Sequence, residues 1–136
     1  MDISISQAQG KVSVTMIKLD GQLDGQNFQD VIAKAQELIN SGTRHILLDL
    51  TDLTYISSAG LVALHTIALL LRGEAAPDLE HGWSAYRSMA RSSTSGLEEK
   101  IKLLNPRAEV KSVFEMVGFD RVFAMFSNYD EAVKSF

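Results

Sequence analysis

The sequence predicts an α/β fold, with an open mixed β-sheet, helices packed mainly on one face, and a single domain that carries a long insertion. Two patterns predict it. Short runs rich in Ile, Leu or Val alternate with helical stripes along the chain, and residues 73–100 interrupt that alternation. With 136 residues, 46% of them hydrophobic, the chain is long enough for one domain, residues 1–136, with its own core.

The chain opens with a predicted antiparallel hairpin. Ile3 and Ile5 alternate with serines, and residues 12–19 are rich in β-branched side chains. The polar stretch 7–11 between them supplies the turn. A helix follows, because apolar residues recur at helical spacing before a Ser-Gly stop at positions 41 and 42: Phe28, Val31, Ile32, Ala35, Leu38 and Ile39.

A buried strand and a second helix form the centre of the chain. Residues 45–50 are dominated by Ile and Leu, which is typical of a strand covered on both faces. The helix is predicted to begin at Ser57 or Ser58 and to end at Arg72. Residues 53–71 carry no charge, but the helix is only about 22 Å long at 1.5 Å per residue. We therefore expect it to be buried against the sheet and not to enter a membrane.

The C-terminal part is predicted to complete the sheet. A strand begins at Ile101, and a helix lies between Pro106, favoured at a first helical position, and Gly118, favoured just past a helix end. Residues 121–126 form a short apolar strand and residues 129–136 a terminal helix. The predicted order is two strands, helix, strand, helix, insertion, strand, helix, strand and helix.

The insertion at residues 73–100 is too long for an ordinary connection inside a compact domain. It contains Trp83, the only tryptophan, followed by Tyr86 and Met89 at roughly helical spacing, and residues 92–96 have the composition of a flexible linker. Two interpretations stay open. The segment is a docking or self-association arm anchored by Trp83, or it is a tolerated surface insertion whose aromatic side chains fold back on the domain.

Two adjacent hydroxyls, Ser57 and Ser58, stand where the central helix begins. Unpaired backbone N–H groups and the helix macrodipole favour negative charge at such a position, so a phosphoryl group is compatible with the fold. It adds about −1.5 to −2 charges, enough to reject a partner that fits the bare hydroxyl. The alternative is that both serines only cap the helix.

Composition excludes several classes of function. The net charge of −4 and the pI near 5.3 argue against general nucleic-acid binding. The chain has no cysteines, which excludes disulfides and thiolate metal sites. The N-terminus lacks the basic start and apolar run of a secretory signal, so we expect a cytoplasmic protein.

Enzyme signatures are also missing. The sequence has no Gly-x-Ser-x-Gly elbow, no phosphate-binding Gly-x-x-x-x-Gly-Lys-Ser/Thr loop and no His-Glu-x-x-His pair. Its three histidines stand in no recognisable relation to an acid, and we expect His65 to be a core or interface residue. The prediction is a protein that is not an enzyme and has no cofactor, metal site or catalytic residue.

Four segments together resemble the STAS domain family, and specifically the anti-sigma-factor antagonists of partner-switching systems. Residues 19–24 resemble the family's Gly-polar-Leu-Asp strand end, residues 45–50 its central strand, and residues 55–61 its phosphorylation loop. Residues 101–136 are similar to its closing strand, helix, strand and helix. The resemblance implies a mixed sheet and a protein partner.

The resemblance also implies roles for individual residues. Ser58 aligns with the serine that a partner kinase phosphorylates; Ser57 replaces an Asp that many members have, and Ala59 a second Ser or Thr. Asp24 matches an acidic residue near that loop, although a turn or cap residue is an equally good interpretation. The predicted partner-binding residues are Asp24, Ser57, Ser58, Ala59, Gly60, Leu61 and Trp83.

Three functional hypotheses follow. In the first, the unphosphorylated chain binds an anti-sigma factor that is also a serine kinase, and phosphorylation of Ser58 releases it; ATP and Mg²⁺ belong to that partner. In the second, the chain is a STAS scaffold or transporter-associated subunit that binds its partner constitutively. In the third, it senses a small anion or nucleotide between the helix N-terminus and Asp24.

Overall fold

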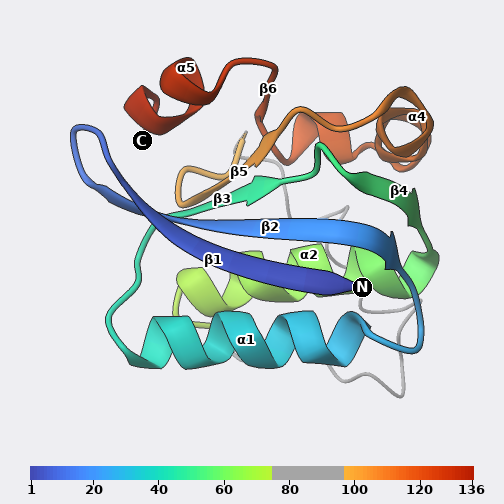
Figure 1. The fold of residues 1–136 in the computed structure, drawn as a ribbon, viewed down its shortest axis with the longest axis horizontal. Coiled ribbons are helices and arrows are strands. Elements are labelled where there is room, and N and C mark those ends of the chain that lie inside the picture. The colour runs from blue at the N-terminus through green and yellow to red at the C-terminus, as the bar shows by residue number, and fades with distance from the viewer. Residues whose placement is uncertain (75–96) are drawn as a thin grey trace.

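The computed structural model describes residues 1–74 and 97–136, which form one six-stranded mixed sheet with helices on both of its faces (Figure 1). The strands follow the order β1-β2-β3-β5-β6, and β4 pairs with the end of β2. The strands are β1 (Asp2–Gln9), β2 (Ser13–Leu23), β3 (Ile46–Asp49), β4 (Leu53–Ile56), β5 (Ile101–Leu104) and β6 (Met125–Phe126). The helices are α1 (Phe28–Asn40), α2 (Ser58–Leu71), α4 (Ala108–Val117) and α5 (Tyr129–Lys134).

The N-terminal hairpin is the only antiparallel pair in this described sheet. β1 and β2 pair in continuous register from Asp2 opposite Asp20 to Gln9 opposite Ser13, whereas β2 with β3, β3 with β5 and β5 with β6 pair in parallel. The predicted hairpin, central strand and mixed sheet are confirmed. The turn was predicted too long, because residues 7–9 pair with β2 as part of β1.

Two strand predictions need correction. Strand β4 was not predicted; its two central residues, Thr54 and Tyr55, are exposed, and its two end residues, Leu53 and Ile56, are buried. The predicted strand over residues 121–126 was wrong in extent, because only Met125 and Phe126 form β6. The apolar residues before it pack into the core from a turn that follows a short 3-10 helix, Phe119–Arg121.

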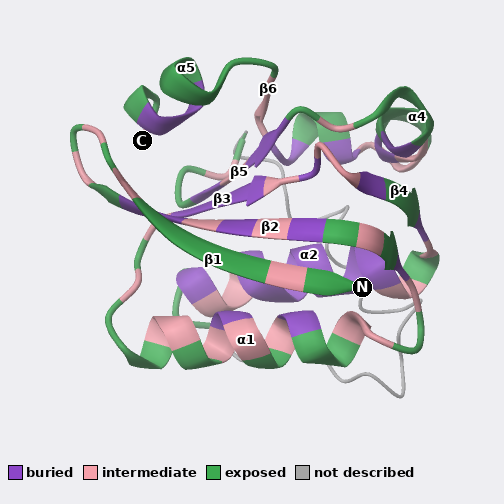
Figure 2. Ribbon diagram, viewed as in Figure 1, coloured by how far each residue is buried: buried purple, intermediate pink, exposed green. Residues whose placement is uncertain are grey.

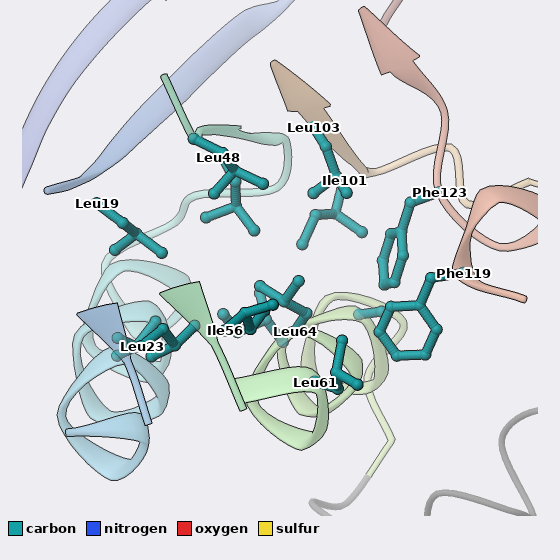
Figure 3. Close-up of a cluster of buried hydrophobic side chains, with 14 of the residues drawn as sticks. Leu19, Leu23, Leu48, Ile56, Leu61, Leu64, Ile101, Leu103, Phe119 and Phe123 are labelled. Carbon is teal, nitrogen blue, oxygen red and sulfur yellow. The ribbon is translucent and has the colours of Figure 1, made fainter. Parts of the chain in front are cut away.

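The main core lies between the sheet and helices α1 and α2. Leu19 and Leu23 of β2, Leu48 of β3 and Leu103 of β5 point to this side and meet Leu64 of α2 (Figure 3). Alternate strand residues point to the other face, where a smaller cluster forms under α5: Val14, Leu47, Leu104, Ala132 and Val133. Most helical packing is therefore on one face, as predicted, and α5 covers part of the other (Figures 1 and 2).

Helix α2 is buried nearly all round, which explains why its sequence is apolar on every side. Within residues 1–74 and 97–136, no helix combines the length and apolarity needed to cross a bilayer. His65 is 5% exposed, and burial, aided by the positive charge of Arg72, lowers its pKa from 6.5 to about 4. The prediction of a core histidine is confirmed.

The insertion leaves and re-enters the domain at one ion-paired junction. Arg72, at the end of α2, donates hydrogen bonds through two guanidinium nitrogens to the Glu98 carboxylate, and a third nitrogen lies 3.3 Å from Glu74. The backbone N–H of Glu98 donates to the Val122 carbonyl at 2.7 Å. Trp83, and the helix predicted around it, lie outside the described residues, so its role stays a prediction.

Candidate functional site

The candidate site is the N-terminus of α2, where the two serines divide the available roles. Ser57 is the N-cap, with extended backbone angles of φ −96° and ψ 176°, and its hydroxyl oxygen accepts a hydrogen bond from the Gly60 N–H at 3.3 Å. Ser58 is the first helical residue and its side chain is exposed. The structure gives the Ser58 hydroxyl no hydrogen-bond partner among residues 1–74 and 97–136. The capping role therefore belongs to Ser57 alone.

This helix end is fixed tightly against the ends of β2 and β4. The Ser57 N–H donates to the Leu23 carbonyl at 2.9 Å. At Gly60 a Cβ atom would lie 2.6 Å from Cγ1 of Ile56 and 3.0 Å from the Leu23 carbonyl oxygen, so only glycine fits without a shift of its neighbours. Ser58 is thus held on a rigid support.

Strand pairing brings Asp24 to the same place. Leu23 and Ile56 are partners in the parallel β2–β4 pair, so the residues that follow them, Asp24 and Ser57, leave the sheet side by side. Asp24 also organises the turn into α1: its carboxylate accepts from the Gln26 N–H at 2.9 Å, and its own N–H donates to the Asn27 side chain at 2.9 Å. Both interpretations of Asp24, a turn residue and a residue beside the loop, describe its position.

The remaining predicted site residues differ in exposure. Ala59 is half-buried, whereas Gly60 is buried and Leu61, 4% exposed, lies in the hydrophobic cluster of Figure 3. Gly60 and Leu61 therefore support the surface from below. Sequence analysis missed Tyr55, which is 51% exposed on β4, three positions before Ser58. The available signal was an aromatic residue next to Thr54, in a four-residue strand whose two central residues are exposed and whose two end residues are buried.

The electrostatics at this helix end favour an anion at Ser58. The first turn of α2 contains no acidic residue, so no side chain there offsets the partial positive charge of its N–H groups. Asp52, before β4, is instead engaged by Lys18 at 2.9 Å, and this carboxylate raises the pKa of the Lys18 amine. Asp24 is the acidic residue that strand pairing places next to the cap.

Other site chemistries find less support. Cavities of about 490 and 530 Å³ lie elsewhere: one is lined by the β1–β2 turn and α5, the other by Thr15, Arg44 and His45 at the opposite ends of the strands. Among residues 1–74 and 97–136, no three His, Asp or Glu side chains are grouped to hold a metal ion. Neither of these two cavities adjoins Asp24, so neither of them supports the small-ligand hypothesis.

Comparison with known proteins gives a match to one family model and to one curated protein. Residues 6–75 match the STAS domain model. The chain is 26% identical over 133 residues to BtrV of Bordetella bronchiseptica, a candidate anti-sigma factor antagonist, covering 92% of this chain and 95% of that protein.

Solved structures agree on the fold. A candidate anti-sigma factor antagonist from Thermotoga maritima superposes with a TM-score of 0.67 at 19% identity, over 97% of this chain and 92% of that one. The phosphorylated form of Bacillus SpoIIAA gives a TM-score of 0.55 at 18% identity, over 97% and 96%. The unphosphorylated form of the anti-sigma factor antagonist SpoIIAA gives a TM-score of 0.53 at 17% identity, over 96% of this chain and 93% of that one. With its family model matched from β1 through α2, this chain belongs to the STAS domain family.

Proposed function

We propose that the chain is an anti-sigma-factor antagonist controlled by phosphorylation of Ser58. Unphosphorylated, it binds an anti-sigma factor; that partner, acting as a serine kinase, phosphorylates Ser58 and is then released. The observation that carries the proposal is the division of roles at α2: Ser57 caps the helix, and the exposed Ser58 hydroxyl has no hydrogen-bond partner among residues 1–74 and 97–136. The names of the similar proteins, antagonists in each case cited above, support the same class.

The proposed switch is electrostatic. A phosphoryl group at the first helical position meets the N–H groups of α2, which stabilise it, so the domain stays folded in both states. The added charge of about −1.5 to −2 instead acts on the docked surface. A partner that closely covers the bare hydroxyl would have to desolvate the phosphoryl group, so its affinity falls.

The proposed docking surface has an exposed and a supporting part. Ser58, Tyr55 and the half-buried Asp24, Ser57 and Ala59 contact the partner, while Gly60 and Leu61 hold this surface in position. Trp83 and self-association through residues 73–100 remain predictions. In this proposal the chain is not an enzyme and works in the cytoplasm without nucleic acid, and the ATP and Mg²⁺ needed for phosphorylation belong to the kinase.

A constitutive STAS scaffold or transporter-associated subunit is the second candidate. It is favoured by Ser57 and Ala59, which depart from the residues that flank the acceptor serine in many partner-switching members. The structure weakens one part of this argument, because Ser57 keeps the N-cap function that Asp also performs. The substitution removes a charge from the loop, while Ser57 still caps α2.

The test is phosphorylation by candidate kinases. The purified chain is incubated with ATP, Mg²⁺ and each GHKL-type serine kinase from the same cell, and phosphate is mapped by mass spectrometry. The proposal expects phosphate on Ser58, its loss in Ser58→Ala, and its retention in Thr54→Ala, which removes a hydroxyl of the neighbouring strand β4 that donates to the Gly21 carbonyl at 3.0 Å. A stable complex without phosphate on Ser58 would instead establish the constitutive scaffold.

A further inference from the structure

The three strand edges described in residues 1–74 and 97–136 differ in protection. β6 is two residues long, and β4 is four residues long with α4 packed against it (Figure 1). β1 is eight residues long, pairs regularly with β2 along its whole length, and is largely exposed (Figure 2). Its outward backbone N–H and C=O groups therefore form a continuous row that no strand of residues 1–74 and 97–136 covers.

The sequence of β1 lacks the usual defences of an edge strand. Proteins normally protect such an edge with lysine, proline, a bulge or a covering segment. Residues 3–9 contain no charged residue and no proline, and the register with β2 has no bulge. Asp2, at one end, carries the only charge in the strand. Such an edge is a template for a further strand.

We infer that β1 pairs antiparallel with β1 of a second copy of this chain, with the two-fold axis at Ser4. An axis perpendicular to the sheet keeps each face on the same side in both copies, so residues of the same parity stand opposite one another. Centred on Ser4, this rule places Ile3 opposite Ile5 of the second copy, and the reverse. The result is a continuous sheet of the two copies. The inference goes beyond the proposed function and does not depend on it.

Burial supports this occupant. Ile3 and Ile5 stand opposite Leu19 and Ile17 of β2, which are fully buried on the helix side of the sheet. Ile5 itself is 37% exposed, and none of the described strands lies beyond it. Two Ile3–Ile5 pairs across the new seam would extend the apolar face of β2 and cover Ile5 from the open side.

The other face of the strand is compatible with the same register. Ser4 meets Ser4 of the second copy, and Asp2 meets Ser6, whose hydroxyl can donate to a carboxylate. No like charges stand opposite. Moving the axis to Ile5 would place Ile3 against Gln7, and moving it to Ile3 would shorten the paired segment. A seam of one strand is small, so we expect a weak dimer whose population depends on concentration.

A single introduced cysteine tests the register, because the chain has none of its own. In Ser4→Cys the two Cα atoms would lie about 4.5–5.5 Å apart, as in any directly opposed antiparallel pair, within the range that a disulfide spans. In the matched control Ser6→Cys, the two sulfur-bearing residues are offset by four positions, about 13 Å along the strand. Under mild oxidation we expect cross-linked dimer from Ser4→Cys and little from Ser6→Cys; equal yields, or none from Ser4→Cys, would overturn the inference.

Sedimentation over a concentration series tests the seam in the absence of oxidant. We expect the wild-type chain to shift toward twice its 15.0 kDa mass as concentration rises, and Ile5→Lys to stay monomeric. Met116→Lys, at an 81% exposed position on α4, is the control and should dimerise like the wild type. A monomer at all concentrations contradicts the inference, and leaves the edge to a strand of another protein. A dimer that survives Ile5→Lys but is lost when residues 75–96 are deleted also contradicts the inference.

Discussion

The Ser57 hydroxyl oxygen accepts the backbone N–H of Gly60 at 3.3 Å, and this one hydrogen bond separates a structural serine from its exposed neighbour. Ser58, one residue on, needs no side-chain partner to hold α2 in place. The consequence is that a modification of Ser58 can change what the surface binds while the helix end keeps its geometry.

The first prediction compares the two serines in stability. Ser57→Ala removes the cap and should lower the free energy of unfolding by about 1 kcal/mol, whereas Ser58→Ala should change it by less than about 0.5 kcal/mol. Urea denaturation of the two variants beside the wild type measures both values. A larger loss in Ser58→Ala than in Ser57→Ala would mean that the caps have been assigned to the wrong residue.

The second prediction concerns charge at Ser58. Ser58→Asp should weaken binding to the anti-sigma factor at least tenfold, about 1.4 kcal/mol, because it places a carboxylate on the docked surface. Ser58→Asn is the matched control, because the Asn side chain has nearly the same shape as Asp but carries no charge. Isothermal titration with the same partner compares the three proteins. If Asn weakens binding as much as Asp, size and not charge is responsible.

The third prediction concerns Gly60. Gly60→Ala forces a methyl group against Ile56 and the Leu23 backbone, so we expect it to destabilise the domain by about 1–3 kcal/mol. Gly25→Ala is the control, since a Cβ there would meet nothing within 4 Å. Thermal and urea unfolding report the difference. Equal effects of the two substitutions would show that the contact at α2 is loose.

The fourth prediction is a pH dependence caused by His65. Its pKa is lowered to about 4 in the folded state from 6.5, so between these values the unfolded chain binds a proton that the folded chain does not. Stability should therefore fall as pH decreases from about 6.5 to 4, by roughly 2–3 kcal/mol from this group. His65→Leu should remove that part of the slope. An unchanged slope in the variant would assign the pH dependence to other groups.

The fifth prediction concerns the insertion. Because Arg72 and Glu98 close its base, replacement of residues 75–96 by a short Gly-Ser linker should leave a folded domain with a cooperative unfolding transition. The shortened chain must keep Glu98, because its backbone N–H also donates a hydrogen bond to the Val122 carbonyl. Aggregation of the shortened chain, with a linker long enough to span the base, would show that the insertion contributes to the core.

Elements with strong periodicity could be predicted from the sequence. The stripe from Phe28 to Ile39, the Gly118 boundary and the buried run at β3 each combine hydrophobic spacing with a stop signal. Pro106 was wrongly predicted to be the first helical residue, because α4 begins at Ala108 with Arg107 as its N-cap. β4 could not be predicted, because four residues that include two exposed ones give too short a pattern, and only pairing with the end of β2 makes them a strand. Val122 and Phe123 were mistaken for strand residues because burial in a turn leaves the same apolar run.

At the site, the sequence placed both serines at the helix start but could not choose between them, because either hydroxyl is able to cap. The choice depends on the backbone angles of Ser57 and on its N–H bond to Leu23, which arise only once β4 pairs with β2. Asp24 was predicted as a site residue from the family resemblance alone. Its position beside Ser57 follows from the pairing of β4 with β2. Tyr55 was missed for the same reason as β4.

The most direct measurement is the affinity of the anti-sigma factor for the chain with and without phosphate on Ser58. Phosphorylated and unphosphorylated protein, separated and verified by mass spectrometry, are titrated against the same partner under identical salt. The account predicts that the phosphorylated form binds at least tenfold more weakly while its unfolding transition stays cooperative. Equal affinity of the two forms would contradict the switch and support a scaffold that binds constitutively.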